Sequence, residues 1–145
     1  MLDSLLPTDG IVVPLVLRLA LAVVIFPHGA QKALGWFGGR GFKATMAYFT
    51  RSGIPAPLAL LAIAAEFLGP LGLALGLLSR VAAFGIACVM LVAIFKVHRP
   101  HGFFMNWSGE QKGEGFEFHL LALGLAVAVI VGGGGAWSLG ALLAR

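Results

Sequence analysis

Four long apolar stretches constrain the fold of this chain more than any other feature. Each is close to the roughly 17 to 25 residues that span a bilayer as a helix, with the third and fourth at the short end. With 59% hydrophobic and only 11% charged residues, a soluble domain of 145 residues could not bury so much apolar surface. The stretches are Ile11 to Leu34, Ala56 to Leu78, Val81 to Val97 and Phe116 to Val131. We therefore predict an all-α integral membrane protein, with residues 1–145 forming one domain.

The connections between the stretches predict how the helices are arranged. Only a tight turn at Leu78, Ser79 and Arg80 separates the second stretch from the third, so these two helices must be antiparallel. The simplest arrangement is a four-helix bundle with up-down-up-down topology. Both termini then lie on one side of the membrane, and the first and third loops lie on the other.

The distribution of Lys and Arg predicts the orientation. Most of these residues fall on the side of the first and third loops, which the positive-inside rule places in the cytoplasm. The residues on that side are Lys32, Arg40, Lys43, Arg51, Lys96, Arg99 and Lys112. We expect a multi-pass membrane protein with both termini outside the cytoplasm. The same basic residues form no stripe on a soluble face, so nucleic acid is not an expected partner.

The first loop contains a short amphipathic segment. Phe42, Met46 and Phe49 recur at helical spacing after a run of glycines and aromatic residues. Lys43 and Arg51 lie off this stripe. The pattern predicts a short helix that lies in the membrane interface.

Ionisable residues gather at the ends of the stretches that share the side of the two loops. Charge in or near hydrocarbon is costly, so such a gathering indicates a functional site. The residues are His28 and Lys32, then Lys96, His98 and His101, then Glu114, Glu117 and His119. Glu117 lies between two phenylalanines and needs a partner, for which Lys32, Lys96 and His98 are the candidates.

Arg18 and Glu66 are charged residues deeper in the apolar stretches. On ideal helices they lie about 10 Å and 18 Å from the termini side, a gap that long side chains can bridge. Pro70 cannot donate a hydrogen bond to the carbonyl of Glu66, which leaves that carbonyl free. We predict a structural ion pair between Arg18 and Glu66, because either charge alone in hydrocarbon is unfavourable.

Metal and haem sites are not predicted, and haem is the less favoured of the possible cofactors. The four histidines lie near one side, but none has a ligand spacing such as HExxH, and no CxxCH attachment is present. Cys88 is the only cysteine, so a disulfide within the chain is excluded.

Several motifs together resemble the DoxX family of small bacterial membrane proteins. They are Arg18-Leu19, His28-Gly29-Ala30-Gln31-Lys32, Gly35-Trp36-Phe37-Gly38-Gly39, Glu66 with its glycine stripe, Gly76 to Arg80, His98, Gly102 to Phe104, and Gly115-Phe116-Glu117. The resemblance implies a four-helix membrane bundle. Relatives in that family include a membrane subunit of thiosulfate:quinone oxidoreductase and proteins tied to oxidative-stress complexes.

The leading functional hypothesis is a redox-associated membrane subunit that binds a quinone or another small polar-headed or anionic ligand. His28 and Lys32 would hydrogen-bond the head group, and His28 or His98 could exchange protons near neutral pH. Glu66 and Glu117 would balance charge or pass protons. The aromatic wall would comprise Trp36, Phe37, Phe103 and Phe104, although an aromatic belt at headgroup depth is an equally good interpretation.

Two other classes of function remain open from the sequence. The first is a non-catalytic scaffold or accessory subunit that docks on redox partner subunits, or on copies of itself, through the glycines of the second stretch. The second is a transporter, for which four spans give little room unless the chain forms an oligomer.

Overall fold

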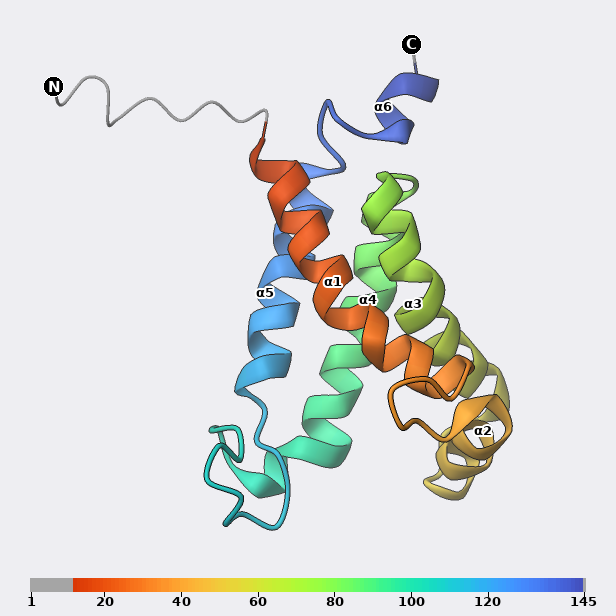
Figure 1. Ribbon diagram of the computed structural model, residues 1–145, viewed down its shortest axis with the longest axis vertical. Helices are drawn as coiled ribbons and strands as arrows, with labels where there is room; N and C mark the ends of the chain where they lie inside the picture. The colour runs from red at the N-terminus through yellow and green to blue at the C-terminus, as the bar shows by residue number, and fades with distance from the viewer. Residues whose placement is uncertain (1–11, 145) are drawn as a thin grey trace, which may run out of the picture.

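The computed structural model describes residues 12–144, and within that range all regular structure is helical (Figure 1). This confirms the all-α prediction for the described part of the chain. The α-helices are α1 (Val13–Ala33), α2 (Gly41–Arg51), α3 (Ala56–Leu75), α4 (Ser79–Ala93), α5 (Glu117–Gly132) and α6 (Leu139–Leu143). After α4 come a π-helical turn, η2 (Ile94–His98), and a 3-10 turn, η3 (Arg99–His101). Ile11, where the first apolar stretch was predicted to begin, lies outside the described residues.

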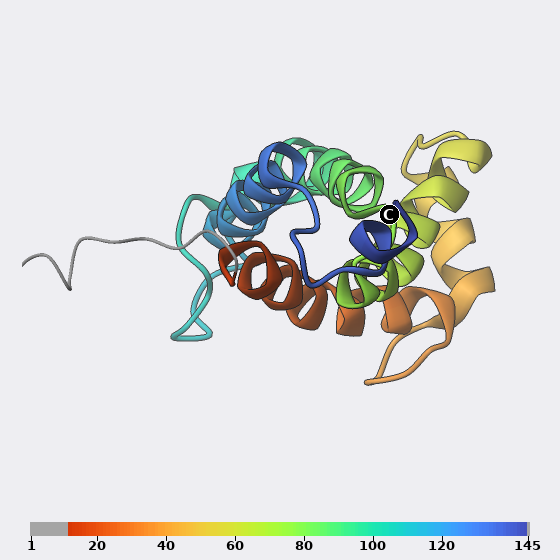
Figure 2. The ribbon, with the colours of Figure 1, turned by 90° about the horizontal axis from the view of Figure 1, so that it is seen from above.

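Four helices lie side by side along the long axis of the molecule. α1 packs against α3 and α5, and α4 packs against the same two helices, which closes a ring when the molecule is seen from above (Figure 2). Successive members of this set run in opposite directions (Figure 1). The short helix α2 packs against α1 and α3 at the end opposite the described chain ends.

Three of the helical segments are long and apolar enough to cross a membrane by length and composition. They are Val13–Ala33, Ala56–Leu75 and the continuous segment Ser79–His101. α5 is apolar but has only 16 residues.

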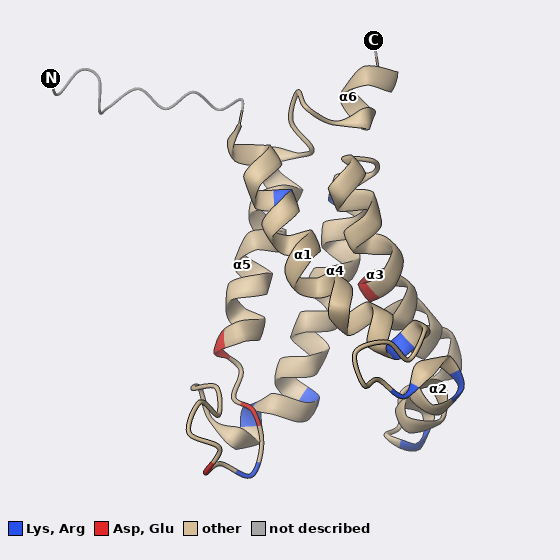
Figure 3. Cartoon of the chain, in the orientation of Figure 1, with Lys and Arg blue, Asp and Glu red and all other residues tan. Residues whose placement is uncertain are grey.

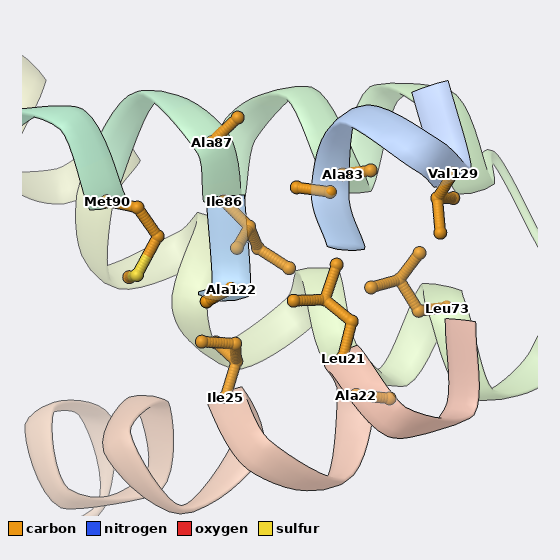
Figure 4. Packing of buried hydrophobic residues seen from close by; sticks show 11 residues of the cluster. Leu21, Ala22, Ile25, Leu73, Ala83, Ile86, Ala87, Met90, Ala122 and Val129 are labelled. Carbon is orange, nitrogen blue, oxygen red and sulfur yellow. The ribbon is translucent and has the colours of Figure 1, made fainter. Parts of the chain in front are cut away.

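The core between the helices is made of aliphatic and small side chains. Leu21 and Ile25 of α1 point toward Ile86 of α4 and Ala122 of α5, and all four are buried (Figure 4). Alanines at such contacts let the backbones approach closely, as is typical of helices packed within membranes. The outward faces are apolar as well, and Val23, for example, is 71% exposed. Apolar surface of this extent is suited to contact with lipid hydrocarbon.

The hairpin between α3 and α4 is set by one glycine. Gly76 adopts a left-handed φ of 71°, and the amide of Leu77 donates to the carbonyl of Gly72 at 2.8 Å, which ends α3 with a Schellman-type cap. Leu78 is also left-handed, and α4 begins at Ser79. The reversal is as tight as predicted, but it lies at residues 76–78, two residues before the predicted turn at residues 78–80. Ser79 and Arg80 are already helical because Gly76 takes the turn conformation.

Candidate functional site

Lys32 in the last turn of α1 and Glu66 in the middle of α3 form an ion pair. The Lys32 Nζ lies 2.8 Å from the Glu66 Oε1. The side chain of Glu66 is 4% exposed, whereas that of Lys32 is 26% exposed. The side chain of Glu66 is therefore enclosed by protein, and that of Lys32 is partly exposed.

The close approach of α1 to α3 explains why this pair forms. Gly29 lies one turn before Lys32, and a Cβ at Gly29 would overlap the carbonyl oxygen of Glu66 and lie 2.6 Å from the amide nitrogen of Phe67. Pro70 leaves that same carbonyl without its helical donor. The backbones of the two helices thus meet where the carbonyl is free, and Lys32 is held within reach of the Glu66 carboxylate.

The predicted ion pair between Arg18 and Glu66 is wrong. Arg18 is 2% exposed, and its Nη1 donates to the carbonyls of Leu73 at 2.6 Å and Ala74 at 2.7 Å. Its Nη2 donates to the carbonyl of Trp137. A guanidinium is stabilised at the C-terminal end of α3, where carbonyls carry partial negative charge. Arg18 therefore fastens α3 and the segment before α6, and Glu66 is paired by Lys32 instead.

A second group of side chains lies on α1, η2 and α5. The ring of His28 is 5.5 Å from that of Phe118, and the ring of His119 is 3.9 Å from that of His98, measured between centroids. The Nδ1 of His98 lies 2.8 Å from the carbonyl oxygen of Glu114. His98 ends the π-helical turn, and such turns re-aim side chains and occur often at functional sites.

Two buried polar atoms of this region have no hydrogen-bond partner among the described residues. They are the Oε2 of Glu66 and the Nδ1 of His119. Buried polar atoms are normally hydrogen-bonded, so these two mark hydrogen-bonding capacity in the helix interior that the described residues do not use. His28 lies one turn before Lys32 on α1, and its ring contacts that of Phe118, the residue before His119, so the two groups adjoin.

His119 was among the ionisable residues that gather on the loop side, but the ligand hypothesis gave it no role, although a signal for its inward position exists. His119, Ala122, Ala126 and Val129 are the buried residues of α5 and recur at helical spacing. A histidine on the inward stripe of an apolar helix faces the other helices. The sequence pattern could have identified it on that ground.

Glu117 has a different environment from the one predicted. Its Oε1 accepts hydrogen bonds from the amide of Met105 and from the indole Nε1 of Trp107, both at 3.0 Å. The partners proposed from the sequence, Lys32, Lys96 and His98, do not pair with it. Glu117 follows the long loop directly, so its nearest donors are those of the loop itself. It holds the loop of residues 102–116 closed onto the start of α5.

The four predicted aromatic wall residues are all exposed. Trp36 stacks edge-to-face with Phe37, and Phe103 does the same with Phe104. Each pair belongs to a different loop, and neither encloses the ion pair. Exposure of this kind favours the aromatic-belt interpretation over a closed lid.

Charged residues gather around α2 and the long loop at the lower end of the molecule (Figure 3). The structure thus brings His28, Lys32 and Glu66 together and places His98 beside His119, while Arg18 lies toward the opposite end of α1. Among residues 12–144, no three His, Cys, Asp or Glu side chains are grouped so that they could hold a metal ion.

These features define a helical membrane protein with a buried ion pair between two apolar helices. The DoxX family model matches residues 13–99, more than half of the chain. The chain belongs to the DoxX family. The match includes Lys32, Glu66 and His98 but ends before α5, so the histidine and carboxylate of α5 lie beyond it. No curated protein and no solved structure matches the chain.

Proposed function

We propose that this protein is the membrane subunit of a redox complex and binds the polar head group of a quinone beside Lys32 and Glu66. The observation that carries the proposal is the buried ion pair, whose carboxylate keeps one oxygen, Oε2, without a partner. Enclosing the Glu66 carboxylate among apolar helices costs several kcal/mol before the attraction of Lys32 is counted, on the order given by ion transfer. An arrangement so costly in hydrocarbon is a functional site by default.

The chain's own residues suit a ligand that presents a polar oxygen. An ammonium has three donors, and Lys32 uses one of them on Glu66, which leaves donors for a carbonyl oxygen of the head group. The ligand must reach Lys32 rather than Glu66, because of the two side chains only that of Lys32 is partly exposed.

His28 is the residue best suited to exchange protons with the ligand. It is exposed on α1, one turn before Lys32, and rests against Phe118. An imidazole gains and loses a proton near neutral pH. A bound quinone accepts two electrons and two protons to become a quinol, and in this proposal a redox partner subunit supplies the electrons. His98 can extend the proton path toward the long loop through its contact with His119.

Other predicted residues have supporting roles in the proposal. The exposed aromatic residues of the two loops lie at headgroup depth and contact the ring or the tail of the ligand. Glu117 fixes the loop that carries Phe103 and Phe104 rather than passing protons.

The same proposal includes four membrane crossings. α5 is short, but helices can cross where the bilayer thins around them. α2 then lies in the interface, and the positive-inside rule places the loop side in the cytoplasm, with the termini outside the cytoplasmic membrane.

Binding of a short-chain quinone to the purified protein in lipid nanodiscs tests this function. Lys32→Gln removes a charge-assisted hydrogen bond and is expected to weaken binding by about 10-fold or more. Lys96→Gln is the matched control, because Lys96 is exposed on the same side, and its affinity should stay within about 2-fold. No measurable quinone binding, or equal losses in the two variants, would contradict the proposal.

A non-catalytic scaffold is the second candidate function. The docking surface predicted on the glycines of the second apolar stretch is not available, because Gly69 and Gly72 of α3 pack within the chain, against Ile86 and Leu77. A Cβ added at Gly124 or Gly132 of α5, in contrast, would meet no other described part of the chain within 4 Å, so a partner helix could approach there. The scaffold function predicts that the wild type co-purifies with a partner and binds no quinone. It also predicts that Gly124→Leu loses this partner, whereas Lys32→Gln keeps it.

A further inference from the structure

We propose that a basic hollow on α2 binds the phosphate group of an anionic phospholipid. The hollow has a volume of about 320 Å³ and is lined by Arg40, Ala44, Tyr48, Arg51 and Ser52. It is separate from the Lys32 and Glu66 site and uses none of its residues. The inference rests on the proposed placement of α2 in the membrane interface.

The lining residues share one face of α2. Arg40, Ala44, Tyr48 and Arg51 recur at intervals of four, four and three, which stacks them along the helix. The Arg40 guanidinium carbon lies 5.9 Å from the centroid of the Tyr48 ring, so this side chain extends along the helix toward Arg51. The two guanidinium groups therefore contribute to one hollow rather than to two separate surfaces.

The charge of this hollow is not neutralised by the protein. Among residues 12–144, only Lys32 and Glu66 form an ion pair with nitrogen and oxygen within 4.0 Å of each other. Arg40 and Arg51 therefore have no carboxylate partner among these residues. The hydroxyl of Tyr48 makes no hydrogen bond to a described residue, so it is a further free donor. Guanidinium groups bind phosphate with two parallel hydrogen bonds, which makes a phosphate ester the fitting ligand.

The surroundings favour a phospholipid over a soluble phosphate compound. On its other side α2 buries Thr45 and packs against α1 and α3, so the helix is fixed at the end of two membrane-spanning helices (Figure 1). Head groups lie at that depth, and cytoplasmic leaflets are anionic. Leu58 and Leu61, near the start of α3, are exposed and offer apolar surface for the acyl chains. The volume is at the small end of ligand pockets, about 300 to 1,000 Å³, as befits a head group.

Lipid retention measured by native mass spectrometry tests the proposal. The protein, purified in detergent, is titrated with phosphatidylglycerol or phosphatidylcholine. We expect the wild type to bind phosphatidylglycerol at least about 10-fold more tightly than phosphatidylcholine, and Arg40→Gln/Arg51→Gln to abolish the preference. Lys43→Gln, an exposed cation of α2 outside the hollow, should keep it. Circular dichroism and gel filtration verify that each variant is folded.

Three outcomes would overturn the inference. The first is equal binding of the two lipids to the wild type. The second is a loss of preference in Lys43→Gln as large as in the arginine variant, which would indicate general surface charge. The third is displacement of the lipid by millimolar inorganic phosphate, which would indicate a free-anion site. Quinone binding is measured on the same arginine variant, so a failure of this inference is distinguished from a failure of the proposed redox function.

Discussion

Replacing Gly29 by alanine tests whether the contact between α1 and α3 sets the ion pair. The new methyl group would overlap the carbonyl oxygen of Glu66 and would lie 2.6 Å from the amide nitrogen of Phe67, where ordinary contacts begin at 3.4 Å. Both obstacles are backbone atoms, so no side chain can rotate away. The shortfall at the amide nitrogen alone is about 0.8 Å, and the overlap with the carbonyl oxygen is deeper, so the helices must separate by more than this.

The expected cost follows from two opposing terms. Overpacking of this kind costs about 1–3 kcal/mol, and backbone obstacles favour the upper end of that range. Replacing a helical glycine by alanine returns about 0.5–1 kcal/mol. We expect Gly29→Ala to lower the free energy of unfolding by about 2 kcal/mol. Gly124→Ala is the matched control, because nothing lies within 4 Å of that site, and it should gain about 0.5–1 kcal/mol.

Reversible unfolding in mixed micelles with increasing sodium dodecyl sulfate measures both variants. The two substitutions are chemically identical, so the opposite signs of their effects isolate the packing term. A stability of Gly29→Ala equal to that of Gly124→Ala would refute the close approach of α1 and α3. The variant should also lose quinone affinity, because Lys32 follows Gly29 by one turn and moves with it.

Three further substitutions have expected outcomes. Lys32→Met leaves the Glu66 carboxylate without a cationic partner and should lower the free energy of unfolding by about 3 kcal/mol. Adding Glu66→Leu to this variant should restore most of the loss. Additive losses in the same unfolding assay would argue against the pair. Arg18→Gln should lower the free energy of unfolding by about 2–4 kcal/mol and speed hydrogen exchange of the amides in residues 137–144. Unchanged exchange in these residues would contradict the anchoring role of Arg18. Glu117→Ala removes the acceptor of the Trp107 indole and should cost about 1–3 kcal/mol. It should also raise tryptophan quenching by acrylamide, and unaltered quenching would show that the loop is held by other contacts.

The helices themselves were predictable because their signals are local. Apolar length located α1, α3, α4 and α5 to within a few residues, and the amphipathic stripe from Phe42 to Phe49 located α2. The need of Glu66 for a cationic partner was predictable too, since a lone charge in hydrocarbon is unfavourable. These inferences depend only on the residues of one segment and on the bilayer.

The identity of that partner was not predictable, because it depends on how α1 and α3 are aligned. The depth estimate assumed that the ends of the two helices are level. In the structure α3 reaches further toward the lower end than α1, so Gly29 near the end of α1 meets Glu66 in the middle of α3 (Figure 1). Arg18 consequently meets the last turn of α3. No single-helix pattern encodes this offset; it follows from the glycine contact.

The same alignment separates the two kinds of ligand that the sequence left open. Lys32 is already neutralised by a carboxylate oxygen 2.8 Å away, so an anion beside it would be attracted by the ammonium and repelled by Glu66. At about 4 Å the attraction is about 4 kcal/mol near a protein surface, and the repulsion by the more distant Glu66 carboxylate offsets part of it. A neutral carbonyl needs only the free donors of the ammonium. Sulfate should therefore fail to compete with a short-chain quinone at equal ionic strength, whereas in Glu66→Gln it should compete; competition by sulfate in the wild type would mean that the carboxylate does not face the ligand.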